Sequence, residues 1–358
     1  MSLVVRWSCC FVALAIGATG AVANALELVA TNPVGATGDK NGWDVGIDGD
    51  TIIVGQIGPA GATGTARVYV NDGSNWTYQA SLVPAGSIAN DLVGHGVAIQ
   101  GDTAVVGVRD YSSATVFTRY GTTWTEGKTL LGPLGGRFGN SVAIDGDWIA
   151  VGASANANCF VSNFDGANWT DPIVLDRSAA TLGVSKLGYD VAVDGDWIFG
   201  GAFLSNAVHI WKYDSGTEQW DYHSGIDNGA DDGYFGIALD VDGDRAIVGA
   251  RNAGGNDGKA YTYTYNSGTD AWELEQTLDG ELGSGELFGS GVSLSGDMAV
   301  IGAYNADVNG QVNSGAAYMY KLSGGTWSLD SAITPATPIA GGTFGNSVDS
   351  TDSAIVVG

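Results

Sequence analysis

Residues 138–153 read FGNSVAIDGDWIAVGA, and residues 288–303 repeat this pattern as FGSGVSLSGDMAVIGA. Further copies begin near residues 41, 93, 187, 235 and 344, so the chain contains seven related units. Every unit has glycine as its second residue and another glycine thirteen residues later. These glycines are Gly42, Gly94, Gly139, Gly188, Gly236, Gly289 and Gly345, followed by Gly55, Gly107, Gly152, Gly201, Gly249, Gly302 and Gly358. The spacing of the units is near 50 residues, which is typical of propeller blades.

Each unit predicts four short strands. In the unit at 138, residues 142–144 alternate, and Asp145-Gly146 suits a two-residue hairpin turn. The apolar run 148–153 is typical of a strand that is buried on both faces, and two further strands are expected at 160–164 and 169–175. No segment has an amphipathic helical period. The chain is therefore predicted to be all-β, a seven-bladed β-propeller with four-stranded blades.

One tryptophan falls at the same phase in six of the units, which offers two interpretations. Such residues pack in the core or between blades, or they form stacking platforms for sugars. One tryptophan per blade at one phase is what packing requires, so packing is favoured. The six are Trp76, Trp124, Trp169, Trp220, Trp272 and Trp327.

The first 25 residues predict an export signal. A positively charged start is followed by an apolar run at 7–18 and by Ala23-Asn24-Ala25, which is typical of a signal-peptide cleavage site. The protein is therefore expected to be secreted or held at the cell surface. Beyond this segment only Cys159 remains, so no internal disulfide is expected, and Cys159 is predicted to be buried.

The propeller is predicted to span residues 26–358, and its ring must close. Residues 26–41 occupy the place of a fourth strand, so we expect them to form the outer strand of the last blade. The chain stops at Gly358, where the second strand of that blade ends, so one strand is missing. The sequence is thus expected to be a fragment of a longer reading frame, with a last blade that is incomplete at its C-terminal end. The alternative is a three-stranded blade with an exposed edge.

The pattern at 138–153 and 288–303 resembles the FG-GAP repeat, and the resemblance covers essentially all of residues 26–358. It implies a β-propeller like those of integrin α subunits and of many secreted bacterial proteins. Integrin-type repeats place a calcium loop of the form D-x-D/N-x-D-G-x-x-D between the first two strands. Here that place holds only a short turn such as Asp145-Gly146-Asp147, too short to wrap a cation that takes about six to eight oxygens. The short-turn variant, without integrin-like calcium sites, fits better.

One other loop is a candidate for weak calcium binding. It has oxygen-bearing side chains at alternate positions and Gly310 where a sharp turn is needed. Ala316 stands where a bidentate glutamate would complete such a site, so the alternative is a polar loop between strands. No other cofactor is expected. The candidate ligands are Asn305, Asp307, Asn309 and Asn313.

The charge of the chain excludes one class of partner and suggests another. Its net charge is −25, which disfavours nucleic-acid binding. Several acids fall in the loops that lead into a new blade, and these loops would gather on one face of the disc. That face is either a solvated rim or a surface for a cation or a cationic ligand. The candidate acids are Asp39, Asp91, Asp231, Asp232, Glu281 and Glu286.

Motifs of catalysis are absent from the sequence. The three histidines lack metal-ligand spacing, and there is no G-x-S-x-G or phosphate-loop motif. We therefore expect a non-enzymatic scaffold that binds an extracellular protein or glycan, with no membrane span in this chain. The alternatives are a glycan-active hydrolase or lyase, whose paired acids could lie anywhere on one face, and an accessory module of a larger extracellular enzyme.

Overall fold

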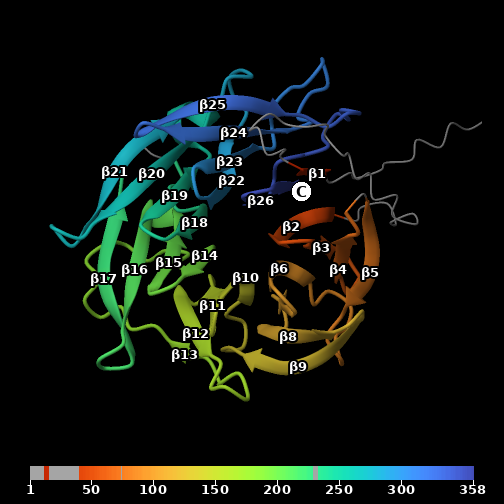
Figure 1. Ribbon diagram of the computed structural model, residues 1–358, viewed down its shortest axis with the longest axis vertical. Helices are drawn as coiled ribbons and strands as arrows, with labels where there is room; N and C mark the ends of the chain where they lie inside the picture. The colour runs from red at the N-terminus through yellow and green to blue at the C-terminus, as the bar shows by residue number, and fades with distance from the viewer. Residues whose placement is uncertain (1–11, 16–39, 74, 229–232) are drawn as a thin grey trace, which may run out of the picture.

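The computed structural model describes residues 12–15, 40–73, 75–228 and 233–358. Its strands form six antiparallel four-stranded blades arranged in a ring (Figure 1). In each blade the first strand lies at the centre of the ring and the fourth at its outer edge. The chain is thus an all-β propeller with four-stranded blades.

The first three blades follow one another along the chain. They are β2 (Lys40–Asp48), β3 (Thr51–Ile57), β4 (Thr65–Asn71) and β5 (Trp76–Leu82); then β6 (Val93–Gln100), β7 (Thr103–Val108), β8 (Ser113–Tyr120) and β9 (Thr123–Leu131); then β10 (Phe138–Asp145), β11 (Trp148–Ala153), β12 (Asn158–Asn163) and β13 (Ile173–Val174).

The next three blades have the same order. They are β14 (Val191–Asp194), β15 (Trp197–Ala202), β16 (Ala207–Asp214) and β17 (Gln219–Asp227); then β18 (Ala238–Asp242), β19 (Arg245–Ala250), β20 (Lys259–Asn266) and β21 (Ala271–Leu278); then β22 (Phe288–Ser295), β23 (Met298–Ala303), β24 (Ala316–Ser323) and β25 (Thr326–Ile333). Two single-turn helices, η1 (Phe203–Ser205) and α1 (Ala253–Asn256), lie in loops.

The prediction of seven four-stranded blades is wrong in number. The last unit supplies two strands, β26 (Val348–Thr351) and β27 (Ala354–Val357), and the third strand of this sheet is β1 (Val12–Ala15), antiparallel to β27. β1 lies within the predicted export signal, so removal of that signal would leave this sheet with two strands. This three-stranded sheet stands between the sixth blade and the first, because β26 contacts both β22 and β2. Residues 26–39, which were predicted to close the ring, lie outside the described part, and residues 40 and 41 belong to β2 of the first blade.

The repeated glycines mark where neighbouring blades touch. A Cβ on Gly302 would collide with the carbonyl oxygen of Gly345 in the following unit, and Gly358 has the same relation to Gly42 across the ring closure. Only glycine permits this backbone contact. The other such pairs are Gly55–Gly94, Gly107–Gly139, Gly152–Gly188, Gly201–Gly236 and Gly249–Gly289.

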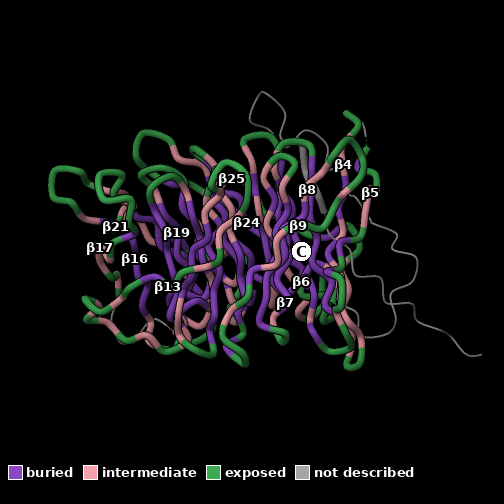
Figure 2. Tube along the Cα trace, turned by 90° about the horizontal axis from the view of Figure 1, so that it is seen from below, coloured by how far each residue is buried: buried purple, intermediate pink, exposed green. Residues whose placement is uncertain are grey.

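The core lies between the blades, where buried strands cross the thickness of the disc and exposed loops cover both of its faces (Figure 2). Four of the six phased tryptophans are buried, and Trp124 and Trp169 pack against the core at its margin. The indole N–H of Trp327 donates to Glu275 of the preceding blade. These positions confirm the packing interpretation, and Cys159 is buried and free as predicted.

The turn that joins the first two strands of a blade lies one residue later than predicted. Asp145 pairs with Trp148, so the turn residues are Gly146 and Asp147. Of these only Gly146 has a positive φ, 52°. Asp145 therefore remains in the inner strand, and its side chain is available to the neighbouring blade.

Candidate functional site

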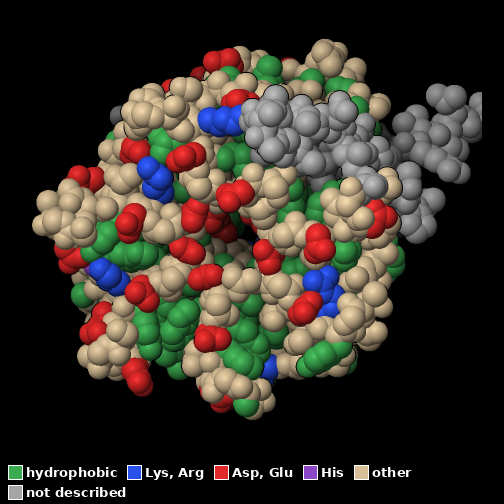
Figure 3. Space-filling view, viewed as in Figure 1, with side chains coloured by type: hydrophobic (Ala, Val, Ile, Leu, Met, Phe, Trp, Pro, Cys, Tyr) green, Lys and Arg blue, Asp and Glu red, His purple; other side chains and the backbone are tan. Residues whose placement is uncertain are grey.

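A channel of about 850 Å³ runs along the axis of the ring and is lined by the inner strands β2, β6, β10, β14, β18, β22 and β26. We call the end at the turns between first and second strands the hairpin mouth, and the opposite end the loop mouth. Acidic side chains gather around a central opening of the disc (Figure 3). The two mouths and the wall between them differ in chemistry.

The hairpin mouth is built from one repeated interaction. The eighth residue of a unit accepts a hydrogen bond from the turn glycine of the next unit, for example from Gly195 N–H to Asp145 and from Gly243 N–H to Asp194, at 2.8 and 2.7 Å. Gln100 plays the same part toward Gly146 with its amide oxygen. The repeated aspartate thus joins neighbouring blades. The residues that accept in this way are Asp48, Gln100, Asp145, Asp194 and Asp242.

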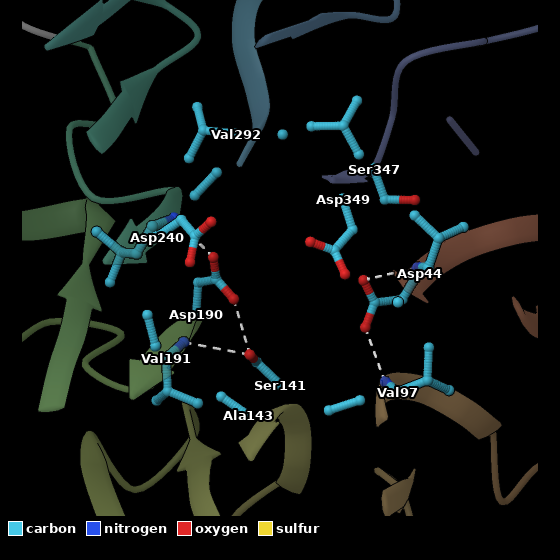
Figure 4. Close-up of a pocket in the computed structure, with 18 of the residues that line it drawn as sticks. Asp44, Val97, Ser141, Ala143, Asp190, Val191, Asp240, Val292, Ser347 and Asp349 are labelled. Carbon is cyan, nitrogen blue, oxygen red and sulfur yellow. Dashed lines mark hydrogen bonds between the residues drawn. The ribbon is translucent and has the colours of Figure 1, made fainter. Parts of the chain in front are cut away.

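Four further carboxylates are half-buried and line the channel wall (Figure 4). Each accepts a backbone N–H from the inner strand of the next sheet around the ring, at 2.7 or 2.8 Å. In Figure 4, Asp44 and Asp349 lie on one side of the channel, and Asp190 and Asp240 lie on the other. The pairs are Asp44 with Val97, Asp190 with Leu239, Asp240 with Leu294 and Asp349 with Ile47.

Burial changes the protonation of these four groups. It raises the pKa of Asp44 to about 8 and the pKa values of Asp190 and Asp349 to about 6, against the opposing effect of the backbone hydrogen bonds. The pKa of Asp240 is also raised well above its ordinary value, first by burial and then by the charge of Asp349. At neutral pH part of the channel wall is therefore protonated.

The loop mouth is formed by the third residue of each unit, and this residue differs around the ring. The rings of Trp43 and His95 lie 5.3 Å apart, and His95 Nδ1 lies 2.8 Å from the carbonyl oxygen of Asn140. The Asn140 amide in turn donates to the carbonyl oxygen of Tyr189. The residues at this position are Trp43, His95, Asn140, Tyr189, Ile237, Ser290 and Asn346, and all of them line the channel.

Basic side chains surround the loop mouth. The Lys40 ammonium lies 4.5 Å above the Trp43 ring, and the Arg251 guanidinium lies 5.7 and 5.8 Å from the rings of Tyr234 and Tyr304. The pKa of His95 is lowered to about 3, first by burial and then by nearby cations, so its imidazole is neutral at physiological pH. The cations that act on His95 are Arg109, Arg137 and Lys40.

The acids predicted to form a binding rim have different environments. Asp91 is buried and accepts the N–H of Ile88 at 2.6 Å, and Glu286 is buried with the Tyr318 hydroxyl donating to it. Glu281 is exposed. A binding role for this set stays a prediction. Asp39, Asp231 and Asp232 lie outside the described residues.

The predicted calcium loop uses its polar atoms for its own fold. The Asp307 carboxylate accepts the N–H of Asn313 at 2.8 Å, and the Asn305 amide donates to the carbonyl oxygen of Gly285. Asn309 lies exposed at a left-handed backbone position. Within the described residues, no group of three or more His, Cys, Asp or Glu side chains could hold a metal ion. Calcium binding here stays a prediction.

The sequence analysis missed the four channel carboxylates. Asp44 and Asp190 are the fourth residues of their units, where the other units have glycine, alanine or serine, and Asp240 and Asp349 are sixth residues among small ones. These acids break the repeat at positions that line the channel, and this is the signal that could have identified them. The cations around the loop mouth were missed because they lie outside the repeated motif.

Comparison with known proteins supports this architecture. The family model of the FG-GAP repeat matches residues 134–168 and 275–320. With the ring of four-stranded sheets, these matches define the class: the chain is a β-propeller in which two segments match the FG-GAP repeat. No curated relative matches the sequence. No helix in the described part of the chain is long and apolar enough to cross a membrane.

Three solved structures are similar in fold. A protein from Lactobacillus plantarum is 15% identical with a TM-score of 0.60, and the match covers 92% of this chain and 98% of that chain. A periplasmic gluconolactonase from Pseudomonas aeruginosa is 14% identical with a TM-score of 0.59, covering 92% and 97%. The β-propeller domain of Cps50 (Swd1) from Myceliophteria thermophila is 12% identical with a TM-score of 0.59, covering 91% and 98%. At these identities the likeness shows the fold alone.

Proposed function

We propose that this chain is a non-enzymatic, exported binding scaffold that holds a glycan or protein ligand at the loop mouth. One observation carries this proposal: the seven units present seven side chains at one position of the repeat, in or just before the inner strands, and these are of six different types. At the hairpin mouth the equivalent positions repeat an aspartate that is held by backbone N–H groups. Side chains that differ at one position of a repeated fold can form a surface that recognises a specific ligand. This follows because function resides in sites placed on a fold and not in the fold itself.

The channel carboxylates are consistent with a scaffold. Each of the four accepts a backbone hydrogen bond from the next inner strand, and Asp190 also accepts one from the Ser141 hydroxyl at 2.7 Å. Groups held in this way join the blades around the ring. They supply the rigidity that a preorganised binding surface needs.

The test is binding to arrays of glycans and of extracellular proteins, by the wild type and by Tyr189→Ala. Tyr189 lies at the loop mouth and is half-buried against Phe203, with ring centroids 4.6 Å apart. We expect the wild type to bind at least one ligand and Tyr189→Ala to bind it at least tenfold more weakly. The control is Tyr120→Ala, which removes an exposed ring at the end of β8, and thermal unfolding checks that both variants fold. Unchanged binding by Tyr189→Ala, or no ligand in either array, would refute the proposal.

A second candidate is a hydrolase that acts on glycans or sugar lactones. The favouring observation is Asp44, because a channel carboxyl with a pKa of about 8 is protonated at neutral pH and could act as a general acid. One of the proteins similar in fold is a gluconolactonase. Hydrolysis of glucono-δ-lactone or of a polysaccharide that is lost in Asp44→Asn would support this candidate. An absence of turnover by the wild type would exclude it for those substrates.

A further inference from the structure

We infer that the loop mouth is an anion site and that its ligand is an acidic saccharide, a sugar that carries a carboxylate or a sulfate. This inference rests on the proposed function, because it names the class of ligand that the same mouth would bind. It is carried by four cations, by the aromatic rings among them, and by the absence of opposing partners for two of these cations within the described residues.

The cations converge from four places in the sequence. Lys40 begins β2, Arg137 directly precedes β10, and Arg109 and Arg251 directly follow β7 and β19. The chain has only 14 basic residues against 39 acidic ones, so four at one mouth is a marked concentration. Like charges that gather without an anion repel one another, and the charge of Arg137 helps to lower the pKa of Arg109, after burial. A bound anion would relieve this repulsion.

These cations are poorly compensated by the protein. The Nε atom of Arg109 is buried and has no hydrogen-bond partner in the described part of the chain, and the nearest carboxylate, Asp110, lies 3.8 Å away. Arg251 lies over two aromatic rings, and among the described residues neither it nor Arg137 has an ion pair. Guanidinium groups bind carboxylate and sulfate oxygens with two parallel N–H bonds. The donors for such an anion are therefore already in place.

The aromatic rings favour a sugar over a simple ion. Trp43, Tyr189, Tyr234 and Tyr304 are all half-buried around this mouth. Their flat apolar faces can pack against the apolar face of a pyranose ring, while the neighbouring cations meet its charged substituent. A channel of about 850 Å³ lies behind them and has the size of a small-ligand site.

The acidic wall of the channel limits how deep the anionic group can go. Asp44 directly follows Trp43 and Asp190 directly follows Tyr189, so the carboxyl groups begin just inside the mouth. Burial raises the pKa of Asp44 to about 8, and in its protonated form this group can donate a hydrogen bond to a sugar hydroxyl. The expected pose therefore keeps the anionic substituent at the mouth and places the neutral ring edge toward the channel.

The experiment compares charged and neutral forms of the same sugar by isothermal titration calorimetry. The first pair of probes is tetragalacturonate and its fully methyl-esterified form, and the second is sulfated neocarratetraose and its desulfated form. We expect at least one charged probe to bind the wild type at least tenfold more tightly than its neutral partner. Because the interaction is partly exposed, the difference should shrink as salt is raised from 50 to 500 mM. Preference in the first pair indicates a uronate, and preference in the second indicates a sulfated sugar.

Variants assign the effect to the loop mouth. Arg109→Gln and Arg251→Gln should each lower the affinity for the preferred charged probe about 5- to 20-fold and leave the affinity for its neutral partner unchanged. Arg251→Lys keeps the positive charge but lacks the planar guanidinium group. Its affinity for the charged probe should lie between those of the wild type and Arg251→Gln. The matched control is Lys128→Gln, which removes a half-buried cation of the outer strand β9 that pairs with Asp171, and this variant should bind both probes as the wild type does.

The outcomes separate this inference from the proposed function. Equal binding of the charged and neutral probes overturns the anion site but leaves a glycan-binding mouth. Binding that is insensitive to both Arg variants also overturns the anion site. If no probe binds, the acidic-saccharide inference is wrong, whereas the proposed function fails only if the wider glycan and protein arrays are empty as well.

Discussion

The same seven units form both mouths of the channel. At the hairpin mouth the residues of the units repeat, whereas at the loop mouth they vary. At the hairpin mouth, Asp145 and its counterparts do one task in five successive units, because the turn of the next unit presents a glycine N–H that needs an acceptor. At the loop mouth, the third residue of the unit changes from Trp43 to His95 to Asn140. Residues that repeat from unit to unit therefore form the structural framework of the molecule, which we call the frame. Residues that depart from the repeat form its candidate site.

The largest loss of stability is expected when a repeated glycine at the loop end of a blade is replaced. Gly302→Val should destabilise the fold by more than about 3 kcal/mol, because its side chain would collide with the carbonyl oxygen of Gly345 in the next sheet. The measurement is urea unfolding, with soluble yield as a second readout. Gly216→Ala, which changes a glycine of an exposed loop, is the control. A stable Gly302→Val protein would show that repetition does not mark the frame.

The next effect concerns the hairpin mouth. Asp194→Ala and Asp242→Ala each remove the acceptor of a turn glycine N–H, at 2.7 Å for Gly243 and 2.6 Å for Gly296. Each should cost about 1 kcal/mol, and the double variant should lower the melting temperature by about 4–8 °C. Arg251→Gln at the loop mouth should change the melting temperature by less than about 2 °C. If the variants at both mouths lowered the melting temperature equally, the hairpin mouth would not be more important for stability than the loop mouth.

A pH profile tests the channel wall between the mouths. The pKa values of Asp44, Asp190 and Asp349 are raised by burial to about 8, 6 and 6, so the folded chain holds protons that the unfolded chain releases. Because the folded state binds more protons than the unfolded state, the free energy of unfolding falls as the pH rises from about 4 through each raised pKa. The melting temperature of the wild type should therefore fall between pH 5 and pH 8.

The variant Asp44→Asn isolates this contribution from the general repulsion of a chain with a net charge of −25. Because it removes a group whose pKa is raised to about 8, its melting temperature should fall less than that of the wild type between pH 6 and pH 8, by about 5 °C. Superimposable profiles would show that Asp44 is ionised throughout this range.

The sequence predicted the frame well because the frame is repeated. The glycines, the inner hairpins and the phased tryptophans each occur many times, and all of them proved structural. The number of four-stranded blades was overestimated. The prediction that the last unit supplies only two strands is confirmed, but the strand that pairs with β27 is β1, which the repeat does not predict. The channel carboxylates and the cations were missed, since Asp44, Asp240 and Arg251 come together only after the ring is formed.

The smallest effect is expected from removing divalent cations. The loop around Asp307 lies on the same face as the loop mouth, but its carboxylate already accepts the N–H of Asn313, and its Asn305 amide is bonded to Gly285. The short hairpin turns offer no ligand ladder for calcium. We therefore expect EDTA, or 5 mM calcium, to shift the melting temperature by less than about 2 °C, which is below about 1 kcal/mol for a domain of this size. Asp307→Asn is the matched variant and should respond in the same way. A loss of more than about 10 °C in EDTA that Asp307→Asn abolishes would make this loop a structural calcium site, and the frame would then depend on a part of the loop face that does not repeat.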